Sequence, residues 1–115
     1  GDIYHKFLKA RSITGTRFVH LSVPCPAGWA FPTKDTIKVG RLAVESGVVI
    51  LYEVEKGVFR LTGKTLSMAR SGRKRPVEEY LQLQGRFKKM SSQQIVELQR
   101  QVDERWDEFM KRAEM

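Results

Sequence analysis

The stretch that decides the fold is Arg17-Phe18-Val19-His20-Leu21-Ser22-Val23-Pro24-Cys25-Pro26, residues 17–26. Its first seven residues alternate, and one side of the alternation is entirely apolar, which is typical of a β-strand. The two prolines fix the backbone φ angle and remove hydrogen-bond donors, so the strand ends in a stiffened turn. The sequence therefore predicts a strand over residues 17–23 that presents the thiol of Cys25 at its end.

The residues after this turn predict a second strand, which is reached through a helix. Thr33 can cap a helix over about residues 34–46, and Gly47 follows as a stop signal. Residues 48–52 are continuously apolar and rich in β-branched side chains, as in strands that are covered on both faces. A strand, a helix and a strand in this order form a βαβ unit, so we expect two parallel strands joined by a right-handed crossover.

Three shorter elements surround this unit. Residues 53–61 predict a hairpin that turns at Lys56-Gly57, and residues 2–12 predict a helix with an apolar stripe. Pro76 stands where the first turn of a short helix would begin.

The last segment predicts a long helix. Ser91 and Gln94 have the spacing of a capping box, in which each residue bonds the backbone N–H of the other. Apolar residues then recur every three or four positions and form one stripe. The members of this stripe are Ile95, Leu98, Val102, Trp106, Phe109 and Ala113.

Together these elements predict the α/β class, with a partial doubly wound sheet (one βαβ unit plus a hairpin) and trailing C-terminal helices. Such a sheet is very small, and the chain offers few helices to cover the strand at residues 48–52. We therefore expect residues 1–63 to be the C-terminal portion of a larger α/β domain. Residues 64–115 are expected to form a basic loop and a C-terminal helical arm.

The positive charge is concentrated in one part of the chain. The net charge is +8, and residues 60–89 carry nine basic and two acidic side chains. Residues 64–75 lack hydrophobic periodicity and aromatic side chains, so we expect a solvated loop or a docking arm. A basic nucleic-acid-binding or interaction module centred on residues 60–89 is the alternative, with nucleic acid the less favoured partner.

The composition favours a reducing compartment and no membrane partner. Cys25 is the single cysteine, so the chain cannot close an intramolecular disulfide. No apolar stretch approaches the roughly 20 residues that a membrane span needs. The first residues also lack the features of a signal peptide. We expect a cytoplasmic protein.

Cys25 is the candidate site residue, and its sequence context leaves three interpretations open. Its thiolate suits a metal ligand or a nucleophile, whereas a buried, inert sulfur is the third interpretation and the one we favour from the residues alone. Nearby His20 is better explained as a hydrogen-bonded structural residue, and no acid completes a triad with Ser22. The sequence also lacks a Gly-rich phosphate loop and a Cys-x-x-Cys pair, so no self-contained catalytic site is found.

Four segments, in this order, resemble the C-terminal region of the β subunit of 2-oxoacid:ferredoxin oxidoreductases. The pyruvate enzyme, pyruvate synthase, is the most similar class, and the string from Pro76 to Phe87 is the most specific part. The segments are Val19-His20-Leu21-Ser22-Val23-Pro24-Cys25-Pro26-Ala27-Gly28-Trp29, Leu42-Ala43-Val44-Glu45-Ser46-Gly47, Leu51-Tyr52-Glu53-Val54-Glu55-Lys56-Gly57 and Arg75-Pro76-Val77-Glu78-Glu79-Tyr80-Leu81-Gln82-Leu83-Gln84-Gly85-Arg86-Phe87.

This resemblance implies cofactors and partners. In that family the β subunit binds thiamine diphosphate with Mg²⁺ and holds a four-iron–four-sulfur (4Fe-4S) cluster. The enzyme decarboxylates pyruvate or another 2-oxoacid, transfers the acyl group to coenzyme A and passes electrons to ferredoxin. Its other subunits are α, γ and δ chains or fused equivalents. The resemblance implies that Cys25 matches the cysteine of the family's Pro-Cys-Pro-x-Gly-Trp turn, which ligates the cluster.

Part of the family pattern is missing from this chain. The family's other cluster cysteines and its Gly-Asp-Gly-type diphosphate motif have no counterpart here. We therefore expect a fragment or split-gene product that binds neither thiamine diphosphate nor a cluster by itself and is inactive alone. Its expected contribution is one cluster ligand together with surfaces that dock on other subunits.

Overall fold

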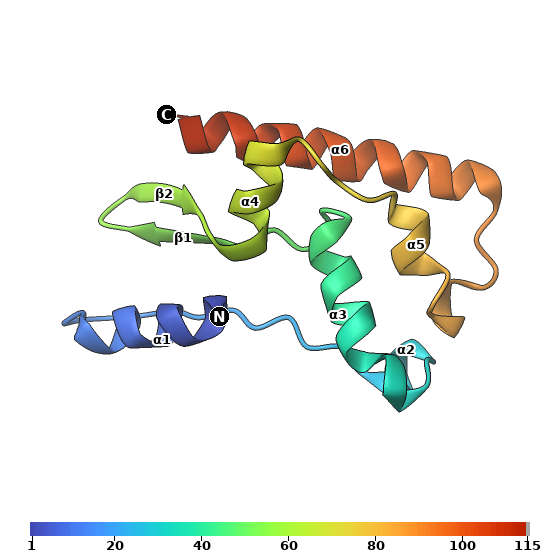
Figure 1. The fold of residues 1–115 in the computed structure, drawn as a ribbon, viewed down its shortest axis with the longest axis horizontal. Helices are drawn as coiled ribbons and strands as arrows, with labels where there is room; N and C mark the ends of the chain where they lie inside the picture. The colour runs from blue at the N-terminus through green and yellow to red at the C-terminus, as the bar shows by residue number, and fades with distance from the viewer. Residues whose placement is uncertain (115) are drawn as a thin grey trace.

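The long C-terminal helix α6 (Ser92–Glu114) forms one side of the molecule, and the other elements lie below it in Figure 1. Its start is the predicted capping box. The backbone N–H of Gln94 donates to Ser91 Oγ at 3.2 Å, and the backbone N–H of Ser91 donates to Gln94 Oε1 at 2.8 Å. These two bonds satisfy donors that the first turn of a helix otherwise leaves free.

The computed structural model describes residues 1–114 and contains helices and one two-stranded sheet. No helix in this range is both long enough and apolar enough to cross a membrane. In chain order the elements are α1 (Asp2–Ser12), α2 (Pro26–Trp29), the 3₁₀ helix η1 (Thr33–Asp35), α3 (Thr36–Glu45), β1 (Tyr52–Glu55), β2 (Val58–Leu61), α4 (Gly63–Ser71), α5 (Val77–Leu81), the 3₁₀ helix η2 (Gly85–Phe87) and α6.

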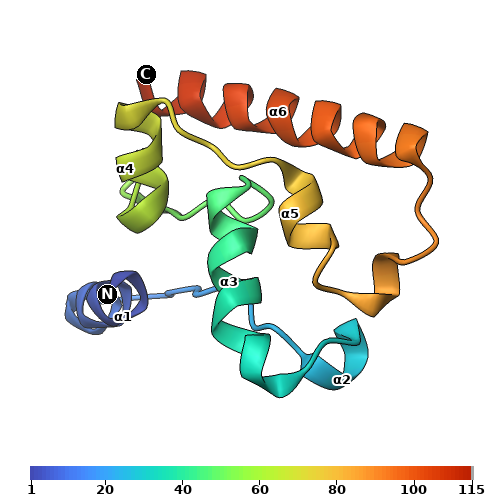
Figure 2. The same cartoon turned by 45° about the vertical axis from the view of Figure 1, so that its right-hand side comes forward.

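The hydrophobic core lies where α3, α5 and α6 meet, and Figure 2 shows α5 between the other two helices. Full burial of such side chains stabilises the fold by about 1.5–3 kcal/mol each. Because helix α6 buries Val102 here and packs Ile95 and Leu98 beside it, the predicted apolar stripe does face the core. The buried core residues are Phe31, Val39, Leu42, Ala43, Val77, Tyr80, Leu81 and Val102.

The predicted hairpin is confirmed. Strands β1 and β2 pair antiparallel, and the turn residues Lys56 and Gly57 have φ angles of 52° and 77°. Two successive positive φ values match the twist of the flanking strands. The hairpin is attached to α6 through aromatic contacts, since the rings of Tyr52 and Phe59 lie 5.3 and 5.7 Å from that of Phe109.

The mixed α/β class is confirmed, but the prediction of a βαβ unit is wrong. Residues 17–23 have no regular secondary structure, and the second strand begins only at Tyr52. Within residues 1–114 the single β-ladder is the antiparallel hairpin. A strand exists only where a neighbour accepts and donates its backbone hydrogen bonds, and residues 17–23 have no such neighbour among residues 1–114.

The prediction for the basic segment, residues 64–75, is also wrong in part. Residues 64–71 were expected in a solvated loop, yet they belong to helix α4, which buries Thr65 and Met68. The Thr65 hydroxyl accepts a hydrogen bond from the backbone N–H of Leu51 at 2.9 Å. Gly72, with a φ of 66°, ends the helix in the left-handed conformation.

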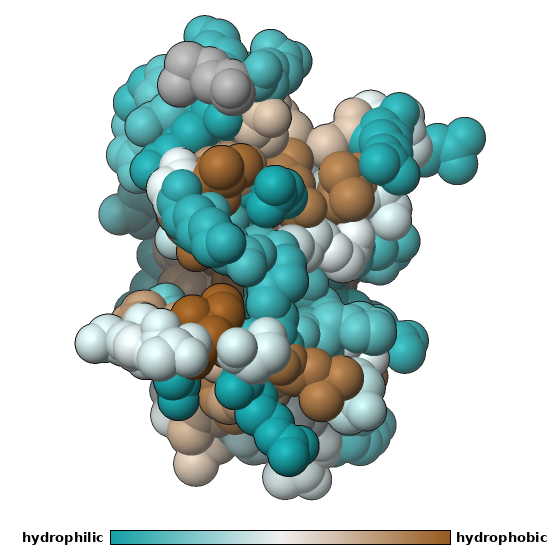
Figure 3. Space-filling model, turned by 90° about the vertical axis from the view of Figure 1, so that its left-hand side faces the viewer, coloured by the Kyte–Doolittle hydropathy of each residue, from teal (hydrophilic) through white to brown (hydrophobic). Residues whose placement is uncertain are grey.

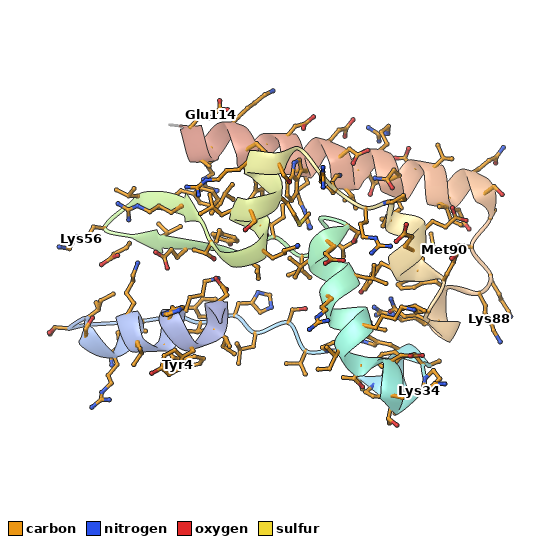
Figure 4. All side chains as sticks on the ribbon, viewed as in Figure 1. Tyr4, Lys34, Lys56, Lys88, Met90 and Glu114 are labelled. Atoms are coloured by element: carbon orange, nitrogen blue, oxygen red, sulfur yellow. The ribbon has the colours of Figure 1, made fainter. Side chains whose placement is uncertain are left out.

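The N-terminal arm, residues 1–24, contrasts with the rest of the molecule. Helix α1 buries none of its residues, and its main polar link is the pairing of Lys9 with Glu53 and Glu55 of the hairpin. The hydrogen bond to Glu53 is the main reason why the pKa of Lys9 is raised. Figure 3 shows hydrophobic side chains at the surface at the level of α1, and Figure 4 shows Tyr4 on the side of α1 that faces away from the hairpin.

Candidate functional site

Cys25 lies on an exposed turn between the N-terminal arm and the core, where it forms the N-cap of the short helix α2. Its Sγ accepts a hydrogen bond from the backbone N–H of Gly28 at 3.3 Å. A Cβ at position 28 would approach that sulfur to 3.3 Å, so the glycine leaves room around the thiol. The exposed position excludes the buried, inert sulfur that we favoured from the sequence.

The backbone of this turn, residues 24–30, is closed by its own hydrogen bonds. The N–H of Trp29 donates to the carbonyl of Cys25 at 2.8 Å, and the N–H of Phe31 donates to the carbonyl of Pro26 at 3.1 Å. Ala30 has a φ of 56°, which is unusual for a residue with a side chain. The turn therefore has a defined conformation, as the prolines around Cys25 predicted.

A second segment, residues 80–87, holds this turn against the core, and we call it the anchor. The backbone N–H of Gly85 donates to the carbonyl of Ala30 at 2.7 Å. A Cβ at position 85 would lie 2.8 Å from the Cβ of Ala30, a distance that real side chains do not reach. Position 85 therefore needs glycine because two backbone segments approach closely here, and not only because a helix ends nearby.

Arg86 joins the anchor to the turn through its side chain. Its guanidinium lies 4.1 Å from the ring centre of Trp29, within the range of a cation–π contact. Its Nε donates to Gln84 Oε1 at 2.8 Å, and its Nη2 donates to the hydroxyl of Tyr80 at 3.1 Å. Because Gln84 and Tyr80 are buried, the arginine is oriented by groups that cannot move freely.

The sequence did not predict these contacts. Gly85 was interpreted as a helix stop, and Arg86 was not singled out as a functional residue. The signal was the length and specificity of the string from Pro76 to Phe87, which a short amphipathic helix does not require. Gly85 and Arg86 of that string contact the turn that carries Cys25, and Tyr80 and Gln84 orient Arg86.

The remaining sequence candidates do not join this site. His20 is exposed, and in residues 1–114 no hydrogen bond links Cys25 to a histidine or a carboxylate. No group of three or more His, Cys, Asp or Glu side chains in the described residues could hold a metal ion. Cys25 therefore presents one sulfur ligand and lacks a base of its own, which disfavours a small thiol enzyme.

Part of the positive charge in the basic region is paired within the molecule. Lys64 and Arg75 both lie within 4 Å of Glu45, and Lys74 pairs with Asp103. Lys74 also lies 5.6 Å from the ring centre of Trp106. These contacts give several of the basic residues a structural role inside the molecule, so they do not favour the nucleic-acid alternative.

No protein-family model matches the chain, but several curated proteins do. It is 40% identical over 104 residues to pyruvate synthase subunit PorB of Methanocaldococcus jannaschii, which covers 90% of this chain and 33% of the relative. It is 40% identical over 115 residues to ketoisovalerate oxidoreductase subunit VorB of Pyrococcus abyssi, covering 99% of this chain and 35% of that subunit. PorB of Thermotoga maritima is 39% identical over 114 residues, with coverages of 95% and 33%. The chain therefore spans about a third of the length of these curated relatives.

Proposed function

Because this chain belongs to the same family as the PorB and VorB subunits, we propose that it forms the Cys25-bearing part of the β subunit of a 2-oxoacid:ferredoxin oxidoreductase. In this proposal the complete enzyme oxidises pyruvate or a related 2-oxoacid, transfers the acyl group to coenzyme A and reduces ferredoxin. The other subunits, α, γ and δ or fused equivalents, are its partners. The chain alone is inactive.

The observation that carries the proposal is the geometry of the Cys25 turn. Iron–sulfur clusters are held by cysteine thiolates, and hydrogen bonds to the sulfurs tune their potentials. The Cys25 sulfur is exposed, accepts the N–H of Gly28 and is held by a turn that the anchor fixes. These residues fit one ligand of a 4Fe-4S cluster, and such a cluster supplies electron transfer when bound.

The remaining ligands have to come from elsewhere, because the chain has one cysteine and the cluster needs four. The described residues contain no cluster of three or more His, Cys, Asp or Glu side chains that could hold a metal ion, so this chain gives no support to a Mg²⁺ and thiamine diphosphate site of its own. The role of this chain is to hold one sulfur at a fixed place. Gly85 and Arg86 act on that sulfur only through the turn, which makes them positioning residues.

The test uses a chimera in which this chain replaces the matched third of the M. jannaschii PorB subunit, coexpressed with its partner subunits. Cys25→Ala is expected to reduce the cluster iron from about four atoms per subunit to a small fraction of that value. Ser22→Ala, three residues earlier in the same segment, is the matched control and should retain the iron. Iron and acid-labile sulfide are measured together with the absorbance of the oxidised cluster.

Full iron content in the Cys25→Ala chimera would overturn the assignment of this ligand. The isolated chain gives a second test, because reconstitution with iron and sulfide is expected to leave it without a stoichiometric cluster. A stable 4Fe-4S cluster on each isolated chain would contradict the proposal that the other ligands lie outside it.

A further inference from the structure

The segment Phe18–Val23 in the N-terminal arm is an extended chain without backbone partners. Among residues 1–114, no backbone or side-chain hydrogen bond involves the N–H or C=O groups of residues 16–24. Backbone groups in a folded protein are nearly always paired, and an unpaired extended segment pairs readily with another strand. The segment thus has a row of free donors and acceptors.

The side chains of the same segment are apolar and exposed. Phe18 is 88% exposed, Val23 is 69% exposed, and Leu21 is close to half exposed. Soluble proteins rarely leave neighbouring large apolar side chains in water without a partner for them. Leu21 and Val23 lie on the entirely apolar side of the alternation, and Phe18 lies on the opposite side with His20 and Ser22.

The end of the segment meets a hollow on the outer face of α3. The hollow has a volume of about 610 Å³, and its lining combines the apolar Pro24, Ile37, Val44 and Leu51 with the charged Arg41, Glu45 and Lys64. Pro24 packs closely against Gly40, where a Cβ would approach the proline ring to 3.3 Å. The C-terminal end of the segment is therefore held against α3, whereas the rest of the segment is free.

We propose that Phe18–Val23 is a strand-addition surface, and that its occupant is a β-strand from the two-thirds of the subunit that this chain does not span. A β-strand can pair its own backbone N–H and C=O groups with the free ones of Phe18–Val23, as in β-augmentation. This chain matches about a third of the relatives' length, so about two-thirds of such a subunit remain to provide the strand. The identity of this occupant rests on the proposed function, which assigns the chain to the β subunit.

Once paired, the segment becomes a strand whose C-terminal end lies against α3. The hollow beside Pro24 and Leu51 then accommodates apolar side chains of the added strand or of its neighbours. The sequence pattern of residues 17–23 is thereby explained, because it specifies a strand whose partner lies outside this chain. Pairing also fixes the N-terminal side of the Cys25 turn, while the anchor fixes the opposite side.

Amide hydrogen exchange tests the inference in the chain alone and in the PorB chimera described above. In the chain alone, the amides of residues 18–23 are expected to exchange at the rates of an unstructured peptide. In the chimera they should exchange at least about 100-fold more slowly, as in a paired strand. Rapid exchange of these amides in a chimera whose hairpin amides are protected would overturn the inference.

Two valines provide a matched pair of variants, because Val23 and Val96 are both 69% exposed. Val23→Asp is expected to abolish co-purification of the chain with a separately expressed polypeptide that contains the other two-thirds of PorB. Val96→Asp, on the outer face of α6, should leave co-purification unchanged, and both variants should keep the thermal unfolding of the isolated chain. Equal capture of the two variants, or capture of neither the variants nor the original chain, would overturn the inference.

The outcomes separate this inference from the proposed function. If the amides of residues 18–23 are protected in a chimera that lacks cluster iron, the strand-addition surface is supported and the assignment of Cys25 as a cluster ligand is rejected. If the chimera contains cluster iron and these amides are unprotected, the cluster ligand is supported and the strand-addition surface is rejected. Amide protection that appears in the chain alone as its concentration rises would identify a second copy as the occupant and would reject the one proposed.

Discussion

The body of the molecule, residues 31–114, and the N-terminal arm contain the same kinds of apolar side chains but use them differently. The body buries its apolar residues between α3, α5 and α6, whereas the arm buries none in α1 and exposes three of the apolar side chains in residues 18–23. Composition therefore does not separate the two regions. The difference lies in partners, because the body contains the elements that cover its apolar faces and the arm does not.

The largest expected effect comes from a pair of identical substitutions in the two regions. Leu81→Ala removes a buried side chain from the core and is expected to lower the free energy of unfolding by about 2–5 kcal/mol. Leu21→Ala removes an exposed side chain from the arm and should change it by no more than about 0.5 kcal/mol. Urea unfolding of the isolated chain measures both values.

If the two substitutions lowered the free energy of unfolding by similar amounts, the arm would have to pack against the body in solution, and the contrast between the two regions would be wrong. In the PorB chimera the difference between the two substitutions should become smaller. There Leu21 is expected to become buried, so its replacement should cost more than in the isolated chain.

The joint between the two regions gives the next effect. Gly85→Ala is expected to lower the free energy of unfolding by about 1–3 kcal/mol, because the new Cβ collides with Ala30. The control is Gly28→Ala, whose Cβ meets only the exposed thiol of Cys25 at 3.3 Å and should cost at most about 0.5 kcal/mol. Thermal or urea unfolding distinguishes the two variants, and an equal cost would show that the close approach at residue 85 is unimportant.

Ala30→Gly should act in the opposite direction. Ala30 has a φ of 56°, a conformation that costs a residue with a Cβ about 1–2 kcal/mol. Glycine removes this cost but is more flexible in the unfolded chain, so a net gain of up to about 1 kcal/mol is expected. The same substitution should also restore part of the stability of Gly85→Ala, because it removes one of the two colliding groups. Additive effects of the two substitutions in urea unfolding would contradict this coupling.

The same division explains how far the sequence predicted the fold. The hairpin turn at Lys56-Gly57, the capping box at Ser91 and the short helix after Pro76 were predicted because each depends on residues that are close in the chain. Residues 17–23 have an equally clear local pattern, but a strand also needs a neighbour. The pattern of apolar side chains is therefore present in residues 17–23, but the strand that it predicted is not formed.

Helix α4 was missed for another reason. Only Thr65 and Met68 of this helix are buried, so its apolar periodicity is too weak to stand out among the basic residues. The helix owes its stability to contacts with other elements, including the bond from Leu51 to Thr65. Such tertiary support is not visible in a local sequence window.

The candidate site was predicted in part. The turn around Cys25 followed from its prolines, whereas its exposure and its anchor did not, because Gly85 and Arg86 meet the turn only after the chain has folded. Long-range contacts of this kind have no local sequence signal. In this chain the only indication was a specific string of residues that had no local explanation.

The smallest expected effect concerns the solvent face of α6, where the body resembles the arm in being exposed. The pKa of Glu97 is lowered from 4.5 to about 2, first by the hydrogen bond from Arg100 and then by that from Gln101. A carboxylate whose pKa is lower in the folded state adds stability at pH values above about 4.5, and this contribution is lost as the pH falls toward 2. Glu97→Gln should therefore lower stability slightly at pH 7 and less at pH 3.

Unfolding in urea at these two pH values, at low and high salt, measures this effect. The difference between Glu97→Gln and the original chain should shrink at high salt, because exposed charges are screened. Glu108→Gln on the same helix is the matched control, since Glu108 forms no ion pair in the described residues. If Glu97→Gln had the same effect at both pH values, the ion pairs on this face would be absent in solution. The contrast between body and arm would then rest on the buried core alone.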